Sequence, residues 1–81
     1  MYLVKRERDG RVLRTYYDHE VTILAITRKR SDAEKDLRSR YKVKSEHFGK
    51  RATFKGTDTD FYIVFSEPEL KLTEHYYIIE E

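Results

Sequence analysis

Histidine and aspartate are the side chains in this sequence that could bind a metal ion or move a proton. His19, His47 and His75 are widely dispersed, and no two have a spacing such as H-x3-H. We expect His19 in a turn, His47 in a loop and His75 near a strand start. Asp58 and Asp60 could approach a divalent cation, but no third acidic ligand follows at calcium-loop spacing. Both aspartates fit a turn better, because Asp side chains bond nearby backbone N–H groups. We therefore predict no metal site.

The familiar signatures of catalysis are missing. The sequence has no cysteine, which excludes disulfides, a thiolate nucleophile and zinc bound through sulfur. It also has no glycine-rich phosphate loop and no G-x-S-x-G motif. A chain of 81 residues rarely encloses a pocket of ligand size. We expect a protein that is not an enzyme and needs no cofactor.

Several aromatic residues stand in adjacent pairs, and neighbours on a strand point to opposite faces of a sheet. If a helix covers only one face, one member of each pair is left on the other face. Exposed tyrosine is typical of protein-binding hot spots, and it also stacks on bases of single-stranded nucleic acid. The alternative is that every ring lies in a core short of aliphatic residues. The pairs are Tyr16-Tyr17, Phe61-Tyr62 and Tyr76-Tyr77.

Basic residues gather in the segment "RKRSDAEKDLRSRYKVK", residues 28–44. Asp32, Glu34 and Asp36 dilute this positive run, whereas a nucleic-acid surface favours clustered positive charge. No aromatic RNA-binding motif, G-x-x-G loop or helix-turn-helix pattern accompanies it. Nucleic-acid binding therefore ranks behind protein binding.

The charge is unevenly divided along the chain. Residues 1–56 hold 16 Lys and Arg against 8 Asp and Glu, and residues 57–81 hold 1 against 7. Such asymmetry hints at nucleic-acid binding or an acidic tail. Because the acidic segment is rich in strand-forming residues, we favour neutralisation of one half by the other across a sheet.

The composition indicates a small folded protein. Only 38% of the residues are hydrophobic and 40% are charged, so apolar runs should nearly all face the core. We expect one domain, residues 1–81. The start "MYLVKRERDG" lacks a signal-peptide core, and the longest apolar run, "ILAI", is far shorter than a membrane span. We expect a cytoplasmic protein without membrane contact.

The first elements are predicted to form an antiparallel meander. Asp9-Gly10 lies between two strand-like runs and favours a two-residue type I′ hairpin turn, with Arg8 facing Arg11. This turn would gather arginines at the hairpin tip. "VTILAIT", residues 21–27, is apolar on both faces and is typical of a central strand. The tip arginines are Arg6, Arg8, Arg11 and Arg14.

A helix of about three turns follows. Ser31 or Asp32 is the expected N-cap, with Glu34 completing a capping box after Ser31. The apolar stripe is formed by residues at i, i+4 and i+8, and residues 43–50 are expected to be a connection. The stripe consists of Ala33, Leu37 and Tyr41.

Three strands are predicted after the helix: "RATFKG", "FYIVFS" and "LTEHYYIIEE". In the second, Phe61, Ile63 and Phe65 share one face, and Pro68 ends it. The fold prediction is α+β: a small, mostly antiparallel sheet of five to six strands, in the order βββ-α-βββ, with one helix packed on a face.

The function hypothesis is a small non-enzymatic protein-binding module of the kind that phages and mobile elements use to inhibit or regulate a host macromolecule. The alternatives are a nucleic-acid-binding protein that uses basic residues and exposed tyrosines, and a structural homodimer whose edge strand, 72–80, pairs with its copy. The candidate contact residues are Arg6, Arg8, Arg11, Arg38, Arg40, Lys42, Tyr16, Tyr62 and Tyr77.

Overall fold

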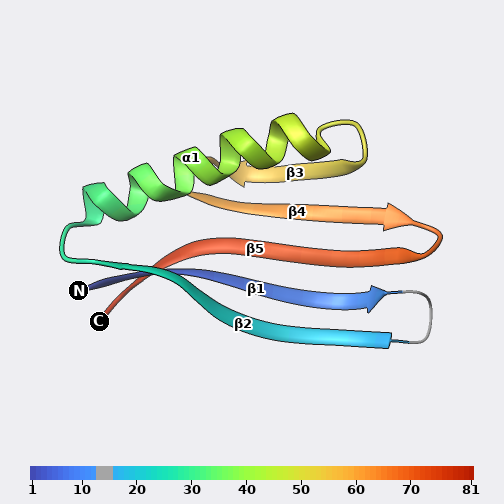
Figure 1. Cartoon of the computed structure of the whole chain (residues 1–81), viewed down its shortest axis with the longest axis horizontal. Coiled ribbons are helices and arrows are strands. Elements are labelled where there is room, and N and C mark those ends of the chain that lie inside the picture. The colour runs from blue at the N-terminus through green and yellow to red at the C-terminus, as the bar shows by residue number, and fades with distance from the viewer. Residues whose placement is uncertain (13–15) are drawn as a thin grey trace.

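The computed structural model describes residues 1–12 and 16–81, and only the backbone of Tyr16. Within those residues, two strands precede a helix and three strands follow it (Figure 1). The elements are β1 (Tyr2–Val12), β2 (Tyr16–Thr27), α1 (Arg30–Phe48), β3 (Ala52–Thr57), β4 (Asp60–Glu67) and β5 (Leu70–Glu80).

The five strands form one sheet in the order β2-β1-β5-β4-β3, and every neighbouring pair is antiparallel. The first and last strands lie side by side along their whole length. Their ends are joined as well, since the Met1 amino group donates to the Glu81 carbonyl oxygen at 2.9 Å and the Glu81 N–H donates to the Met1 carbonyl at 2.8 Å. The predicted α+β class is confirmed, with ββ-α-βββ in place of βββ-α-βββ.

The predicted hairpin turn at Asp9-Gly10 is wrong, because β1 continues through both residues to Val12. Gly10 faces Asp18 on β2 and Leu72 on β5. Its φ is +149°, and a Cβ placed on it would lie 2.1 Å from the Lys71 carbonyl oxygen. Glycine therefore serves here for a close approach of two strands and not for a turn. The pairing of Arg8 with Arg11 is also wrong; Arg14, another predicted tip residue, lies outside the described residues.

The helix is longer than predicted. It runs from Arg30 to Phe48, and its N-cap, Lys29, makes no side-chain capping hydrogen bond, so the predicted capping box is absent. Residues 43–48 continue the helix because no glycine or proline interrupts them before Gly49. Phe48 lies seven residues after Tyr41, which extends the apolar stripe, and it packs on Phe65 at 5.2 Å between ring centroids.

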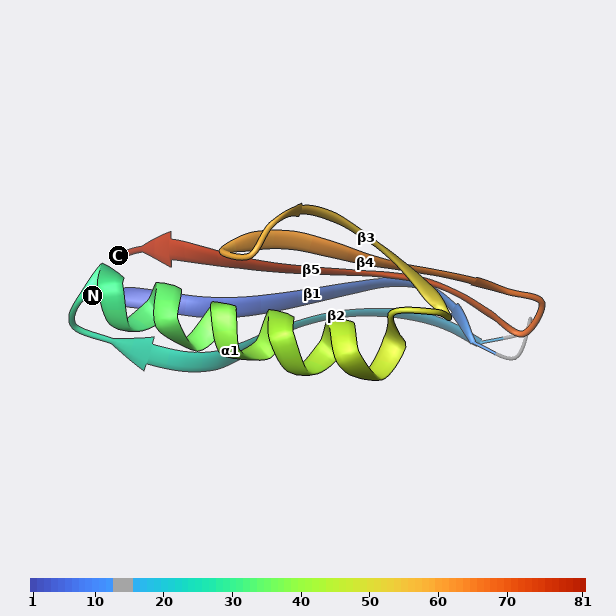
Figure 2. The ribbon, with the colours of Figure 1, turned by 90° about the horizontal axis from the view of Figure 1, so that it is seen from above.

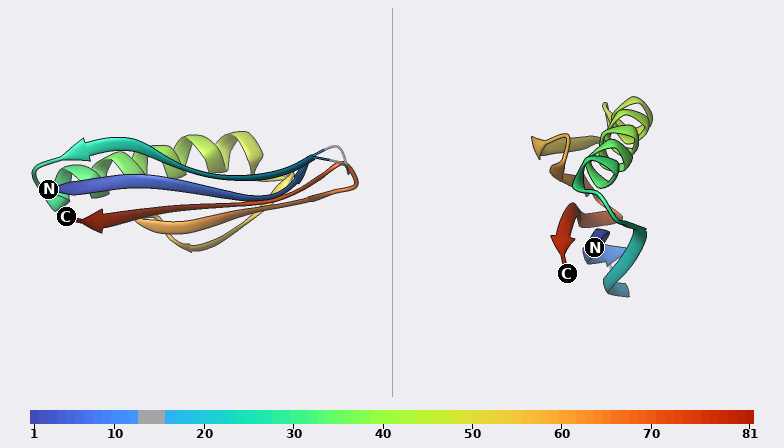
Figure 3. Two further views of the ribbon diagram at one scale, coloured as in Figure 1. Left: turned by 90° about the horizontal axis from the view of Figure 1, so that it is seen from below. Right: turned by 90° about the vertical axis from the view of Figure 1, so that its left-hand side faces the viewer.

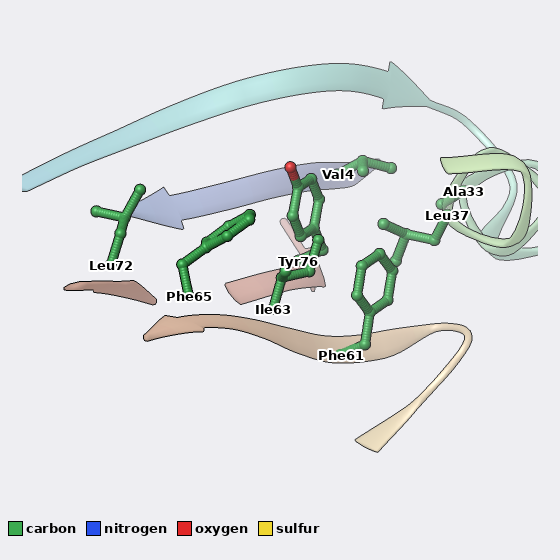
Figure 4. Packing of buried hydrophobic residues seen from close by; sticks show 8 residues of the cluster. All are labelled: Val4, Ala33, Leu37, Phe61, Ile63, Phe65, Leu72 and Tyr76. Carbon is green, nitrogen blue, oxygen red and sulfur yellow. The ribbon is translucent and has the colours of Figure 1, made fainter. Parts of the chain in front are cut away.

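The helix packs on one face of the sheet, and no other described element covers the opposite face, as the views from above and end-on show (Figures 2 and 3). Ala33 and Leu37 are fully buried, and the Tyr41 ring meets Phe54 and Phe61 edge-to-face at 5.7 and 5.0 Å. The predicted stripe is confirmed. The core cluster consists of Val4, Ala33, Leu37, Phe61, Ile63, Phe65, Leu72 and Tyr76 (Figure 4).

Two strand positions differ from the predictions. The segment 21–27, predicted to be a central strand, lies on β2 at an edge of the sheet. The segment 72–80, predicted to be an edge strand, lies on β5 between β1 and β4. The hydrophobicity of a strand does not fix its place here, because the pairing of the two chain ends puts β5 in the centre and leaves β2 outside.

Leu37→Ala should destabilise the protein by about 2–5 kcal/mol, because Leu37 is fully buried between α1 and the sheet and its loss leaves a cavity. Urea unfolding followed by circular dichroism measures the change. Val43→Ala, at a helix position 63% exposed, is the matched control and should stay within about 0.5 kcal/mol of the wild type. Equal losses in both variants would contradict this packing of the helix.

Candidate functional site

The face of the sheet turned away from α1, here called the open face, is the candidate binding surface. Its membership follows from the strand registers and the alternation of side chains along each strand. The residue pairs Lys5–Tyr77 and Lys5–Ile23, for example, place β5, β1 and β2 side chains in one row. The open-face residues used below are Leu3, Lys5, Glu7, Asp9, Tyr17, His19, Val21, Ile23, Ile26, Lys55, Tyr62, His75, Tyr77 and Ile79.

An aliphatic strip, formed by Val21, Ile23 and Ile26, follows β2 along the open face. These side chains are 50%, 52% and 59% exposed. Leu3 lies beside Ile26 in the register and is buried, although it is not part of the core cluster under α1. The open face therefore has an apolar contact of its own, in which Leu3 is buried while the aliphatic strip beside it stays exposed to solvent. Exposed aliphatic side chains gathered in one place mark interaction sites more often than scattered ones do.

An aromatic stack, formed by Tyr62, His75 and Tyr77, crosses β4 and β5 on the open face. The His75 ring lies 4.0 Å from Tyr62 and 4.4 Å from Tyr77, centroid to centroid, with interplanar angles of 7° and 24°. Tyr62 is 41% exposed, and partial burial raises the pKa of Tyr77. The predicted split of the aromatic pairs is confirmed at two of them, because Phe61 and Tyr76 lie in the core on the opposite face. The side chain of Tyr16 lies outside the described residues.

The acid–base groups of the open face are engaged with one another. His75 Nε2 lies 2.7 Å from Asp60 Oδ1, and His19 Nε2 lies 3.4 Å from Glu7 Oε1. Asp58 instead reaches Arg38, at 3.7 Å, so the two aspartates do not converge. Within residues 1–12 and 16–81, no three His, Cys, Asp or Glu side chains gather in a way that could hold a metal ion.

The histidines occupy regular elements and not loops. His19 lies in β2 and not in a turn, and His47 lies in the last turn of α1 and not in a loop. His75 lies within β5, where the aromatic stack covers both faces of its ring. This stacking makes His75 a packing residue of the open face.

Arg6 and Arg8 lie on the helix side of the sheet, away from the tyrosines of the open face. Arg6 donates to Glu20 at 3.1 Å, while its Nε is buried without a hydrogen-bond partner among the described residues. Arg8 contacts Asp18 at 3.6 Å and Glu74 at 3.3 Å, the latter as an ion pair without hydrogen-bond alignment. These arginines compensate buried and half-buried carboxylates.

The groups around Arg6 and Arg8 on the helix side of the sheet shift the pKa values of Glu20 and Tyr76. A hydrogen bond from Thr22, and then one from Arg6, lowers the pKa of Glu20. Burial, together with the nearby charge of Glu74, raises the pKa of Tyr76 to about 12. The Tyr76 hydroxyl donates to Glu74 Oε1 at 3.3 Å, so the neutral phenol is the form that fits this site.

The helix arginines are also paired with carboxylates. Arg38 lies 3.7 Å from Glu34, in addition to its contact with Asp58, and Arg40 pairs with Asp36 one turn earlier. Lys42 is exposed. Arg11 is exposed near the end of β1. The structure therefore does not bring the predicted basic contact residues together with Tyr62 and Tyr77.

The opposite charges of the two chain halves meet, as predicted. Arg8–Glu74, Arg38–Asp58 and Arg51–Glu67 each join residues 1–56 to residues 57–81. The acidic segment lies inside the sheet as β4 and β5.

Sequence reasoning missed the aliphatic strip as a surface. Its signal was present, since Val21, Ile23 and Ile26 stand in a run that is apolar on both faces. Such a run is normally read as buried. Only the position of β2 at the edge, together with a register shift opposite Val4 and Lys5, turns three of its aliphatic side chains to solvent.

Two hollows among the described residues lie away from the open-face stack. One, of about 220 Å³, lies between the C-terminal end of α1 and the sheet. Its walls combine Phe48, Phe65, Leu70 and Leu72 with Arg8, Lys44, Arg51 and Glu74. A larger one, of about 580 Å³, lies by the β4–β5 turn and includes Arg11 and Lys71. Both are open to solvent, and the arginines of the smaller one are already paired with Glu74 and Glu67.

Comparison with known proteins finds no matching family model, curated protein or solved structure. In the part of the chain that the structure describes, no helix has the length and apolarity to cross a membrane.

The stability of the protein should fall between about pH 10 and pH 12. Unfolded tyrosine ionises near pH 10, whereas folded Tyr76 stays neutral until about pH 12. The contribution of Tyr76 is therefore complete below pH 10 and is lost as the pH rises towards 12, by at most about 1.4 kcal/mol per pH unit. Urea unfolding from pH 9 to 12 measures this loss. Tyr76→Phe should flatten the pH dependence, whereas Tyr62→Phe should leave it steep; identical slopes in all three proteins would contradict the assignment.

Proposed function

We propose that this protein is a small non-enzymatic protein-binding module and that it binds its partner through the open face. The observation that carries the proposal is the concentration of exposed apolar side chains there. Tyr17, Tyr62 and the aliphatic strip account for five of the seven large hydrophobic residues identified as exposed in residues 1–12 and 16–81. The two longest extents of the molecule are 40 and 23 Å, which leave room for the roughly 800 Å² that each partner contributes to a standard interface.

The chemistry of the open face supports a protein partner. The aliphatic strip on β2 and the aromatic stack on β4 and β5 flank a row of charged residues on β1, where Lys5 and Glu7 supply charges of both signs. Interfaces between proteins mix apolar and polar groups, and tyrosine is enriched among their hot spots. A rigid antiparallel sheet also holds these side chains in place before binding, which lowers the entropy lost on association.

The proposal extends to the mode of action and the location. A module of this size can inhibit or regulate a host macromolecule by occupying its surface, as many small proteins of phages and mobile elements do. This mode needs a face and no pocket. We place the protein in the cytoplasm, since a fold without cysteine needs no oxidising compartment.

Single-stranded nucleic acid is the second candidate partner. Lys55 faces Tyr62 in the register, and Lys5 faces Tyr77, so a lysine stands at each end of the aromatic stack. Aromatic residues beside cations bind bases and phosphates. This arrangement is weaker than a stacking platform, because the rings of the stack already cover one another.

Affinity capture should test the proposed function. The immobilised wild-type chain, incubated with nuclease-treated extract of the organism that encodes it, should retain a protein that Tyr62→Ala retains at least about 30-fold more weakly. This factor corresponds to a hot spot of about 2 kcal/mol. Binding measured with the purified partner from 50 to 300 mM salt should change little.

Arg38→Ala is the matched control, because Arg38 is exposed on the helix and lies off the open face. It should bind as the wild type does. Capture lost equally in both variants would refute the open face as the binding surface. Capture abolished by nuclease, with a steep loss of affinity in salt, would favour nucleic acid instead.

A further inference from the structure

The two edges of the sheet differ in how they are protected against pairing. Edge strands in natural proteins are commonly kept short or marked with lysine, so that they do not pair with other chains. β3 has both features, with six residues that include Lys55. β2 has neither, since it runs for twelve residues without lysine, arginine or proline.

We infer that β2 is a self-association edge, along which two copies of this chain pair β2 to β2 in antiparallel orientation. The outer backbone groups of an edge strand lack a partner within the sheet, and a second copy supplies them. A two-fold axis makes such a contact self-complementary, because each copy presents the same residues. The product is a continuous ten-stranded sheet.

The charges of β2 select the register of this pairing. All its ionisable residues lie before Val21, and the segment 21–27 has none. A two-fold axis at Thr22 sets Val21 opposite Ile23 of the second copy and Glu20 opposite an uncharged residue. An axis nearer the start of β2 would set like charges opposite one another, which destabilises a strand pair.

The carboxylates of β2 are compensated within each copy, which further favours self-pairing. Asp18 lies 3.6 Å from Arg8, and Glu20 lies 3.1 Å from Arg6. Lys5, on β1, is one strand away from the edge, so the lysines of two copies would stand roughly three strand spacings, or about 14 Å, apart. That distance exceeds the Debye length of about 8 Å at physiological salt, so their repulsion is screened.

Face-to-face packing of two copies is less favourable than edge pairing. It would bury Lys5 and Lys55, neither of which lies within 4 Å of a carboxylate of the described residues, so both charges would lose water without an ion-pair partner. The second copy therefore fits at the edge and leaves the open face uncovered.

The expected affinity is modest. A paired segment of seven residues is about 23 Å long, and a sheet with its side chains is roughly 15–20 Å thick, so each copy buries on the order of 400 Å². This is about half of the ~800 Å² per partner of a standard interface. The dimer should therefore dissociate in the micromolar range. In the dimer the aliphatic strips of the two copies meet at the axis, and the two open faces form one larger surface.

Sedimentation velocity of the full chain from about 1 to 300 μM tests the inference. The wild-type weight-average mass should rise from monomer towards dimer over this range. Ile23→Lys places a charge at the axis and should weaken the dimer at least tenfold. Thr53→Lys, which adds the same charge on the same face at the β3 edge, should dimerise as the wild type does. Circular dichroism should show that all three proteins are folded.

Amide hydrogen exchange at low and high concentration locates the contact. Slower exchange at high concentration should be confined to residues 19–25 of β2. A wild type that remains monomeric throughout, equal loss of dimer in both lysine variants, or protection spread over β4 and β5 would each overturn the inference. Tyr62→Ala separates this inference from the proposed function, because it should impair partner capture and leave dimerisation intact.

Discussion

One helix covers one face of a five-stranded sheet, and the rest of the structure depends on this limited apolar cover. The chain has enough apolar side chains to fill a single interface, in which Leu37 and Ala33 meet Phe61, Ile63 and Tyr76. Phe61 and Tyr76 stack at 4.8 Å and form the centre of this layer. A chain of this size buries only slightly more than 60% of its unfolded surface, so little remains to cover the second face. The open face is a direct consequence of that limit.

The presence of arginines on the helix side of β1 follows from the same shortage of apolar side chains. α1 does not extend its apolar stripe over the whole of the helix side, and charged groups fill the remaining area near β1 and β2. There Arg6 and Arg8 meet Glu20, Asp18 and Glu74. Glu74 is buried, so loss of Arg8 would leave it as an uncompensated charge and destabilise the protein. The basic first half and the acidic second half of the chain are thereby held together, and a large part of the positive charge is not available to a polyanion.

The open face and a free edge of the sheet meet at β2. The strand is at the end of the sheet order because β1 pairs with both β2 and β5, which brings the chain termini into the centre. Its aliphatic strip therefore borders both the open face and the free edge. A partner on the face would contact its side chains, whereas a second copy would pair with the backbone of the edge, and the aliphatic strip would contribute to both contacts.

Local patterns in the sequence determined the element types and most of the faces. The alternation in "FYIVFS" placed Phe61, Ile63 and Phe65 in the core and Tyr62 outside, and the i, i+4, i+8 spacing in the helix identified its buried stripe. These predictions depend on side-chain periods of 2 and 3.6, which a short segment sets by itself. The same reasoning identified Tyr62 and Tyr77 as open-face residues.

The tertiary structure alone decided strand order, and with it the candidate site. Asp9-Gly10 has the local chemistry of a turn, yet close packing against β5 at Lys71 makes the glycine part of a strand. The segment 21–27 has the composition of a central strand, yet it lies at the edge, because β5 returns from the far end of the chain to take the central place. Pairing between residues some 75 positions apart leaves no local signal in the sequence. For that reason the sequence predicted an open aromatic face, while only the fold revealed the aliphatic strip beside it and the withdrawal of Arg6 and Arg8 to the opposite side.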